Sequence, residues 1–239
     1  MRHMILAALC MWSCIMTVTP LLTEEQIGRA TNYIQQHLTK DFNYQYSYFV
    51  KFTEEECNRG LTYDILHKAL KGENADTIYQ QVDDYHIYEG KRMVVSSYDT
   101  FEKSNKKHTL HPEYRLLNPD FHSPISRLLT DGLFAGCSIF YTFFSPCTSK
   151  CSLPDGNYNI IDKLSTIVGL PKDRVFIFKQ VYQRDTKQPS MVVWDSWKSL
   201  NNYIRLLRCS ENNCVQCFKN DIPQYHCYTG SQQSKTLDF

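Results

Sequence analysis

The segment CSIFYTFFSPCTSKC, from Cys137 to Cys151, contains the clearest strand pattern of the chain. Residues 137–144 are almost all large and apolar, which is typical of a strand that helices cover on both faces. Pro146 follows closely, and proline is well suited to the first turn of a helix, where its missing N–H does no harm. The pattern predicts a core strand that ends in a turn and continues into a helix.

Two cysteines of this stretch, Cys147 and Cys151, are four positions apart. In a helix, that spacing places both thiols on the same face of one turn. The N-terminus of a helix also carries partial positive charge, which lowers thiol pKa values and favours the thiolates that zinc binds. The spacing therefore indicates a pair of metal ligands.

A third ligand is expected from His111-Pro112-Glu113. Three protein ligands leave the fourth position of a tetrahedral zinc open for a water, whose pKa the metal lowers. We predict that His111, Cys147 and Cys151 are the ligands. Glu113 follows His111 by two residues, so it is near enough to move a proton without binding the metal. His-x-Glu alone is a weak signal, but its combination with Ser-Pro-Cys, in this order, is a strong one.

At these residues the chain resembles the zinc-dependent cytidine deaminase superfamily and, within it, the AID/APOBEC-like branch. The signature of that branch is His-x-Glu followed by Pro-Cys and a second Cys two to four residues on. The resemblance covers residues from about 86 to about 208. It implies that water replaces the amino group at carbon 4 of cytosine, while Glu113 carries the proton to the departing ammonia.

The resemblance also implies a pocket for the base. Residues 143–147 are similar to the Ser-Trp-Ser-Pro-Cys of that branch, so Phe144 stands where its Trp wall is expected. The backbone carbonyl of Ser145 either accepts a hydrogen bond from the exocyclic amine, or Ser145 is simply a turn residue. Tyr182 occupies the place of an aromatic residue that closes the pocket, although core packing explains it equally well.

The N-terminus predicts export. Arg2 and His3 precede the run from Met4 to Met16, which is apolar except for Ser13. This run is too short to span a bilayer but fits a cleaved secretory signal peptide. We place cleavage between residues 14 and 22 and expect no membrane contact afterwards. A deaminase motif behind a signal peptide is similar to the secreted AID/APOBEC-like deaminases.

Length and composition are consistent with one domain, since 42% of the residues are hydrophobic and 21% are charged. A net charge of +1 excludes a strongly basic protein that holds long nucleic acid through phosphates alone. Basic residues do gather upstream of His111, at Lys103, Lys106, Lys107 and His108. We interpret them as a solvated loop in preference to a phosphate track.

Alternating helix and strand patterns predict an α/β layer structure. A capping box at residues 23–26 opens a helix, residues 44–52 form a strand, and residue 53 begins further helix. Residues 85–98 form a hairpin. The remaining expected elements are helices at 111–117, 126–133, 160–168 and 197–207, and strands at 137–144, 174–182 and 191–194. Whether residues 44–52 provide the first strand of the sheet, with 53–84 as an insertion, stays open.

With the resemblance, these elements predict a cytidine-deaminase-like central mixed sheet flanked by helices, with an extra N-terminal helical segment. We divide the chain into a signal peptide at 1–19, a helix-rich N-terminal extension at 20–84, a deaminase-like catalytic domain at 85–208 and a Cys-rich C-terminal tail at 209–239.

Cysteine usage tests the zinc hypothesis, because in an exported protein the usual fate of cysteine is a disulfide. We favour zinc for Cys147 and Cys151, since a bridge between them would give Pro146 and His-x-Glu no purpose. Cys137 is either a buried thiol or a partner of Cys57, which alternatively pairs with the tail. The tail cysteines form two disulfides or, less favoured, a structural zinc site: Cys209, Cys214, Cys217 and Cys227.

The function that we predict is secreted, zinc-dependent hydrolytic deamination of cytosine to uracil in single-stranded nucleic acid or a nucleoside. The alternative is a secreted, zinc-stapled defence or binding protein whose catalysis is weak or lost. A nucleoside salvage enzyme agrees with the near-neutral charge but not with export or with the Ser-Pro-Cys signature. The sequence does not indicate the oligomeric state.

Overall fold

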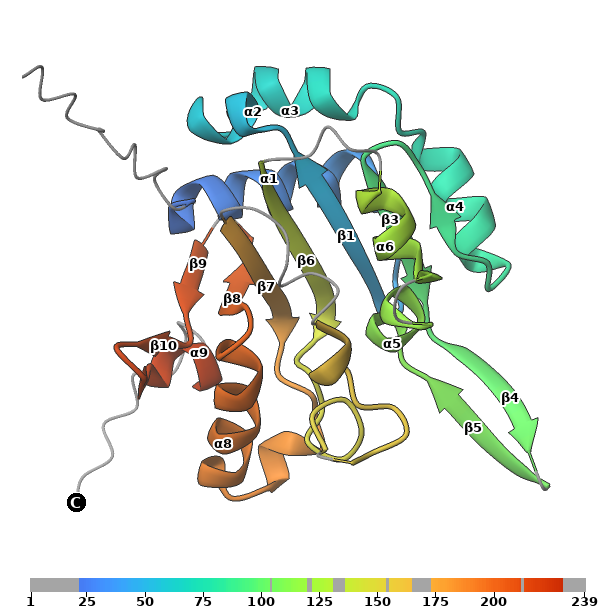
Figure 1. Cartoon of the computed structure of the whole chain (residues 1–239), viewed down its shortest axis with the longest axis vertical. Helices are drawn as coiled ribbons and strands as arrows, with labels where there is room; N and C mark the ends of the chain where they lie inside the picture. Colours follow the sequence, from blue (N-terminus) through green and yellow to red (C-terminus); the bar gives the residue numbers. More distant parts are fainter. Residues whose placement is uncertain are drawn as a thin grey trace, which may run out of the picture.

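A sheet of seven strands, in the order β2-β3-β1-β6-β7-β8-β9, lies at the centre of the described part of the chain (Figure 1). The computed structural model describes residues 22–103, 105–119, 122–130, 136–153, 155–164, 173–211 and 213–229. Strands β6, β7 and β8 run parallel, and their neighbours run antiparallel to them. The strands of the sheet are β1 (Tyr46–Phe52), β2 (Tyr88–Glu89), β3 (Met93–Ser97), β6 (Cys137–Phe144), β7 (Asp173–Gln180), β8 (Arg205–Ser210) and β9 (Asn213–Gln216).

Helices cover both faces of this sheet, as the predicted fold class requires. One face packs against α1 (Glu24–His37), α3 (Tyr63–Leu70) and α4 (Ala75–Asp83), which contribute to one core cluster. The other face packs against α5 (Pro112–Leu117), α6 (Pro124–Leu129) and α8 (Ser190–Asn201), which contribute to a second cluster. The shorter elements are α2 (Glu54–Asn58), α9 (Tyr225–Thr229), η2 (Asp162–Leu164), η3 (Asp185–Lys187), β10 (Phe218–Lys219) and β11 (Ile222–Pro223).

Strand β6 has the bounds that the sequence predicts, residues 137–144. Its side chains alternate between the two cores: Ile139 and Tyr141 join the cluster under α1, whereas Phe140 joins the cluster under α5. On one face, the ring of Tyr141 stacks on that of Tyr48 with 4.7 Å between centroids. Burial on both faces explains why apolar residues run through this strand without the usual polar alternation.

Several expected local signals are present. Thr23 and Gln26 form the capping box that opens α1. The predicted hairpin pairs β2 with β3 through the turn that contains Gly90. Pro112 occupies the first turn of α5, with His111 as the N-cap residue.

The segments predicted as extension, catalytic domain and tail share one sheet, and the division between them stays a prediction. Strand β1 lies between β3 and β6 and pairs antiparallel with both, so residues from the expected extension at 20–84 form the middle of the sheet. At the other end, β8 crosses the predicted boundary after residue 208, and β9 adds an edge strand. The sheet therefore takes strands from all three segments.

Several expectations are corrected at the level of single elements. Residues 145–147 have no regular secondary structure and residues 148–152 form turns, in place of the helix expected after Ser-Pro-Cys. Residues 191–194 belong to α8, and residues 205–207 belong to β8. The supposed loop before His111 is a hairpin of β4 (Asp99–Lys103) and β5 (Lys106–Leu110). Of the helix expected at 160–168, the described part contains only η2.

These corrections have local physical causes. The run Met191-Val192-Val193-Trp194 looks like a strand because two of its residues are β-branched. The residues that α8 buries are Val193, Trp197 and Leu200, which is helical spacing. In the β4–β5 hairpin, Asn105 has φ 59°, a left-handed conformation that asparagine tolerates better than most residues.

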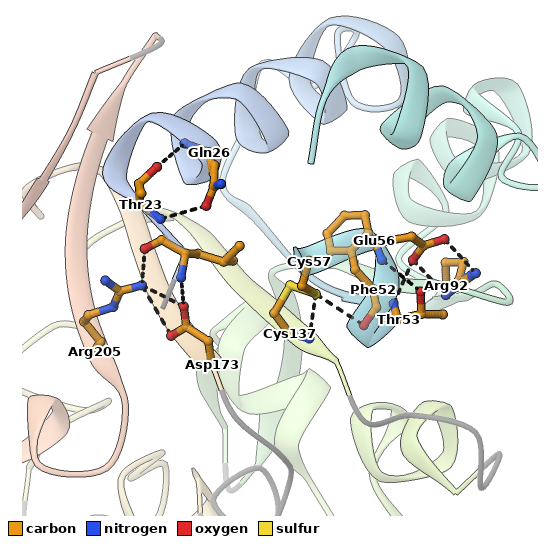
Figure 2. The surroundings of a disulfide bond; sticks show 11 residues. Thr23, Gln26, Phe52, Thr53, Glu56, Cys57, Arg92, Cys137, Asp173 and Arg205 are labelled. Carbon is orange, nitrogen blue, oxygen red and sulfur yellow. Dashed lines mark hydrogen bonds and ion pairs between the residues drawn. A yellow bond between two sulfur atoms is a disulfide. The ribbon is translucent and has the colours of Figure 1, made fainter. Parts of the chain in front are cut away.

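Three disulfides decide between the alternatives for the cysteines. Cys57 pairs with Cys137 and links the end of α2 to the first residue of β6 (Figure 2). The tail forms two disulfides, as favoured over a structural zinc site: Cys209–Cys214 and Cys217–Cys227. Cys147 and Cys151 are the free cysteines of the described residues, and both are buried.

An ion pair anchors the start of the described chain to the sheet. Arg205 and Asp173, at the first residues of β8 and β7, lie 3.0 Å apart (Figure 2). The backbone N–H of Leu22 donates to Asp173, and its carbonyl accepts from Arg205 at 2.8 Å. Residues 1–19, the expected signal peptide, lie outside the described residues. Within the described ranges, none of the helices has the length and apolar character needed to cross a bilayer.

Candidate metal centre

The site lies at the carboxyl end of β6, on the face of the sheet that α5 covers. His111 occupies the N-cap position of α5, where its backbone is extended. Cys147 and Cys151 come from the turns that follow β6. The carboxyl ends of parallel strands are where α/β folds commonly bind ligands. The topology therefore brings together two motifs that are far apart in the sequence.

The side chains of His111, Cys147 and Cys151 converge with their ligand atoms within 4.8 Å of one another. His111 Nδ1 lies 3.1 Å from the sulfur of Cys151 and 3.7 Å from that of Cys147. The two sulfurs are 3.5 Å apart. The two sulfurs therefore lie side by side, as their spacing predicts, although the turn does not continue as a helix.

This spacing fits a tetrahedral metal ion. Zinc binds sulfur at about 2.3 Å and imidazole nitrogen at about 2.0–2.1 Å, which requires ligand atoms about 3.5–3.8 Å apart. Two of the three separations meet this requirement, and the third, 3.1 Å, is shorter by a few tenths of an ångström. With one nitrogen and two sulfurs, the donor set is typical of a catalytic zinc that keeps one position open.

Electrostatics also favour a cation between the sulfurs. A hydrogen bond shared with Cys151, together with the nearby ring of His111, lowers the pKa of Cys147 to about 4. The pKa of Cys151 is raised well above its ordinary value, because it shares that hydrogen bond and is fully buried. Burial opposes a charge on His111, yet its contacts with Cys147 and Glu113 raise its pKa. A bound cation would remove the conflict between two adjacent thiolates.

Glu113 is buried beside these residues, with 1% of its surface exposed. Its Oε1 accepts a hydrogen bond from the hydroxyl of Thr142, on β6. Its Oε2 is buried and has no hydrogen-bond partner among the described residues. Burial raises the pKa of Glu113 despite the opposing effects of His111 and Thr142. A carboxyl group with a raised pKa can both take up and return a proton near neutral pH.

The turn that carries Cys147 is bonded to the segment that follows β7. Asp185 is buried and accepts from Thr148 twice, from the hydroxyl at 2.8 Å and from the backbone N–H at 3.2 Å. Ser145 accepts from the backbone N–H of Tyr182 at 2.9 Å, and its own N–H donates to the carbonyl of Gln180 at 2.7 Å. These bonds join the segment after β6 to the segment after β7.

The residues expected to form the base pocket lie close together at the same end of the sheet. The rings of Phe144 and Tyr182 meet edge to face with 6.1 Å between centroids, and both side chains are partly exposed. Ser145 is buried, and its hydroxyl and N–H serve the turn. The structure thus brings the three predicted residues together, while their contact with a base stays a prediction.

Two residues that support the site were not predicted: Thr142 and Asp185. The sequence gives one indication of Thr142, because it is a hydroxyl residue in a strand of mostly large apolar side chains. It gives no indication of Asp185, since the contact of Asp185 with Thr148 depends on the path of the chain after β7. A second aromatic pair, Tyr114 and Tyr158, lies next to Lys150 of the cysteine turn and was also not predicted.

A protein-family model matches most of the chain. The model of the family described as Secreted Novel AID/APOBEC-like Deaminase 2 matches residues 27–229. The chain belongs to this family. The match confirms the resemblance that the two motifs predict, and it extends beyond residues 86–208 to include β1 and the disulfide-bonded tail.

No curated protein and no solved structure matches the chain. The family description contains the word secreted, and three disulfides are typical of proteins outside the reducing cytosol. Membership and the His111, Cys147 and Cys151 group together identify an AID/APOBEC-like chain with residues that fit a metal ion.

Proposed function

We propose that this chain is an exported, zinc-dependent hydrolase that converts cytosine to uracil in single-stranded nucleic acid or in a nucleoside. The observation that carries the proposal is the buried carboxyl group of Glu113 next to the His111, Cys147 and Cys151 group. Family membership supports the same chemistry. A purely structural zinc site would have four protein ligands and no need for a buried carboxyl group beside it.

His111, Cys147 and Cys151 would hold the zinc, which when bound lowers the pKa of a water in its open position. Glu113 would take up a proton as water adds to carbon 4 of the ring and would give it to the amino group, which would leave that carbon as ammonia. Because Glu113 is buried, its proton exchanges with the reacting groups and not with bulk solvent. The net reaction consumes one water per cytosine.

The aromatic pair Phe144 and Tyr182 would form the wall against which the base lies. The carbonyl of Ser145 would accept a hydrogen bond from the exocyclic amine. A base in a duplex would have to leave its stack before it reached such a site, so single-stranded nucleic acid or a nucleoside is the better substrate.

Metal analysis and a Glu113→Ala variant test the proposal together. The mature chain should contain about one zinc, and Glu113→Ala should keep the zinc while ammonia release from the substrate stops. Glu102→Ala, which removes an exposed carboxylate from the hairpin before His111, is the matched control and should keep full activity. Retained activity in Glu113→Ala would show that another group moves the proton.

A comparison of cytidine with a single-stranded oligonucleotide separates the two substrate classes. With a net charge of +1, phosphate contacts must be local, so activity on the oligonucleotide should fall as salt is raised while activity on cytidine should not. If zinc-loaded protein deaminates neither, the chain is instead a zinc-stapled binding or defence protein.

A further inference from the structure

Three hydroxyl residues form a row across adjacent strands beneath the His111-Pro112-Glu113 turn. Ser96 of β3 is opposite Ser47 of β1, and Ser47 is opposite Thr142 of β6. All three are fully buried. Residues directly opposite one another on paired strands project from the same face of the sheet. A row of buried hydroxyl groups in a core of aromatic side chains requires a reason, because each needs a hydrogen-bond partner.

The two outer members of this row hold the catalytic turn. The hydroxyl of Ser96 lies within hydrogen-bond distance of two carbonyls, that of Pro112 at 3.2 Å and that of Ser97 at 3.1 Å, and so contacts the backbone of the turn. The hydroxyl of Thr142 donates to Oε1 of Glu113 and so binds the carboxyl group itself. Ser47, between them, has no partner for its hydroxyl among the described residues.

We propose that Thr142 is a positioning residue: its hydroxyl fixes the carboxyl group of Glu113 so that Oε2 is the oxygen that exchanges protons with water and substrate. The inference rests on the function proposed above. Oε2 suits this task because it is buried and has no hydrogen-bond partner among the described residues. Oε1 already accepts from Thr142, so Oε2 is the oxygen whose hydrogen-bonding capacity is unused.

Four variants test this role. Thr142→Val keeps the shape of the side chain and removes its hydroxyl, Thr142→Ser keeps the hydroxyl, and Thr142→Ala is a second deletion in case valine does not fold. Ser47→Ala is the matched control, because it removes the neighbouring buried hydroxyl, which has no hydrogen-bond partner among the described residues.

Thr142→Val and Thr142→Ala should lower kcat about 10- to 100-fold, the effect of losing a hydrogen bond to a charged group, with little change in KM or zinc content. Thr142→Ser and Ser47→Ala should stay within about threefold of wild type. If Thr142→Val keeps wild-type kcat, or if Thr142→Ser and Ser47→Ala lose as much as Thr142→Val, the positioning role is overturned.

A readout that needs no activity is the carboxyl carbon signal of Glu113 in ¹³C-glutamate-labelled protein, assigned with Glu113→Gln. We expect this signal to shift in Thr142→Val but not in Ser47→Ala, both with and without zinc. An unshifted signal in Thr142→Val would overturn the inference. If zinc-loaded wild type releases no ammonia, the proposed function fails, while this signal still decides whether Thr142 holds the carboxyl group.

Discussion

At the scale of single residues, the candidate metal centre is supported by groups outside the predicted ligands. Asp185 accepts two hydrogen bonds from Thr148, the residue next to Cys147. Partners that hold the ligands of metal sites in place commonly change metal binding by about 10- to 100-fold when they are lost. We expect Asp185 to act in this way by holding the turn that carries Cys147.

We predict that Asp185→Ala lowers zinc affinity about 10- to 100-fold while the protein stays folded. Asp185→Asn should be milder, because its amide oxygen can still accept from Thr148. Titration against a competing chelator measures the affinities, with the exposed Asp195→Ala on α8 as control. Equal affinity in wild type and Asp185→Ala would mean that the turn holds its shape without this contact.

The grouping of His111, Cys147 and Cys151 could be predicted from the sequence because each motif is local, while the roles of these residues and of Glu113 stay predictions. His111 and Glu113 are two residues apart, and Cys147 and Cys151 belong to one turn, so each pair is local. Thr142 could not be assigned, since its contact with Glu113 depends on where α5 packs on β6. Long-range partners of this kind follow from the fold and not from a motif.

At the scale of secondary-structure elements, strand β6 connects a disulfide at its start to the candidate metal centre at its end. Its first residue forms a disulfide with Cys57, and its end leads into the ligands Cys147 and Cys151. The bridge closes a sequence separation of 80 residues. A cross-link over so long a loop removes much conformational entropy from the unfolded chain.

We predict that replacing Cys57 and Cys137 together by Ser lowers the free energy of unfolding by about 4.5 kcal/mol. The same change at Cys209 and Cys214, which close a separation of only 5 residues, should cost about 2 kcal/mol. Urea unfolding of both double variants measures the difference. A larger loss from the short loop would contradict the entropic explanation.

Element prediction succeeded where burial and periodicity agree and failed where they conflict. Strand β6 and helix α1 have strong patterns and appear with nearly the predicted bounds. The start of α8 is predicted as a strand because two of its residues are β-branched, and the helical spacing becomes clear only further on, at Trp197 and Leu200. The sequence does not decide the role of β1, because its place between β3 and β6 depends on long-range pairing.

At the scale of the whole molecule, the cysteines divide into two chemical groups. Among the described residues, six cysteines form disulfides, and the two at the candidate metal centre are free. Oxidising conditions favour the first group, and a bound metal would protect the second from oxidation. Both groups in one chain agree with the proposed export and zinc binding.

We predict that protein secreted from cells, denatured with chelator present, has two titratable thiols per mature chain. Thiol counting together with the intact mass measures this value and also the N-terminus. A count of zero would indicate a bridge between Cys147 and Cys151. A count of four or more would mean that a disulfide of the sheet or tail does not form, or that residues 10 and 14 remain.

We propose that one imidazole and two thiolates hold a single zinc with room for water beside Glu113. X-ray absorption at the zinc edge of the purified mature chain tests this proposal. It should find two sulfur neighbours at about 2.3 Å and two nitrogen or oxygen neighbours at about 2.0–2.1 Å. A shell of four sulfurs, a shell without sulfur, or a chain that binds no zinc would contradict it.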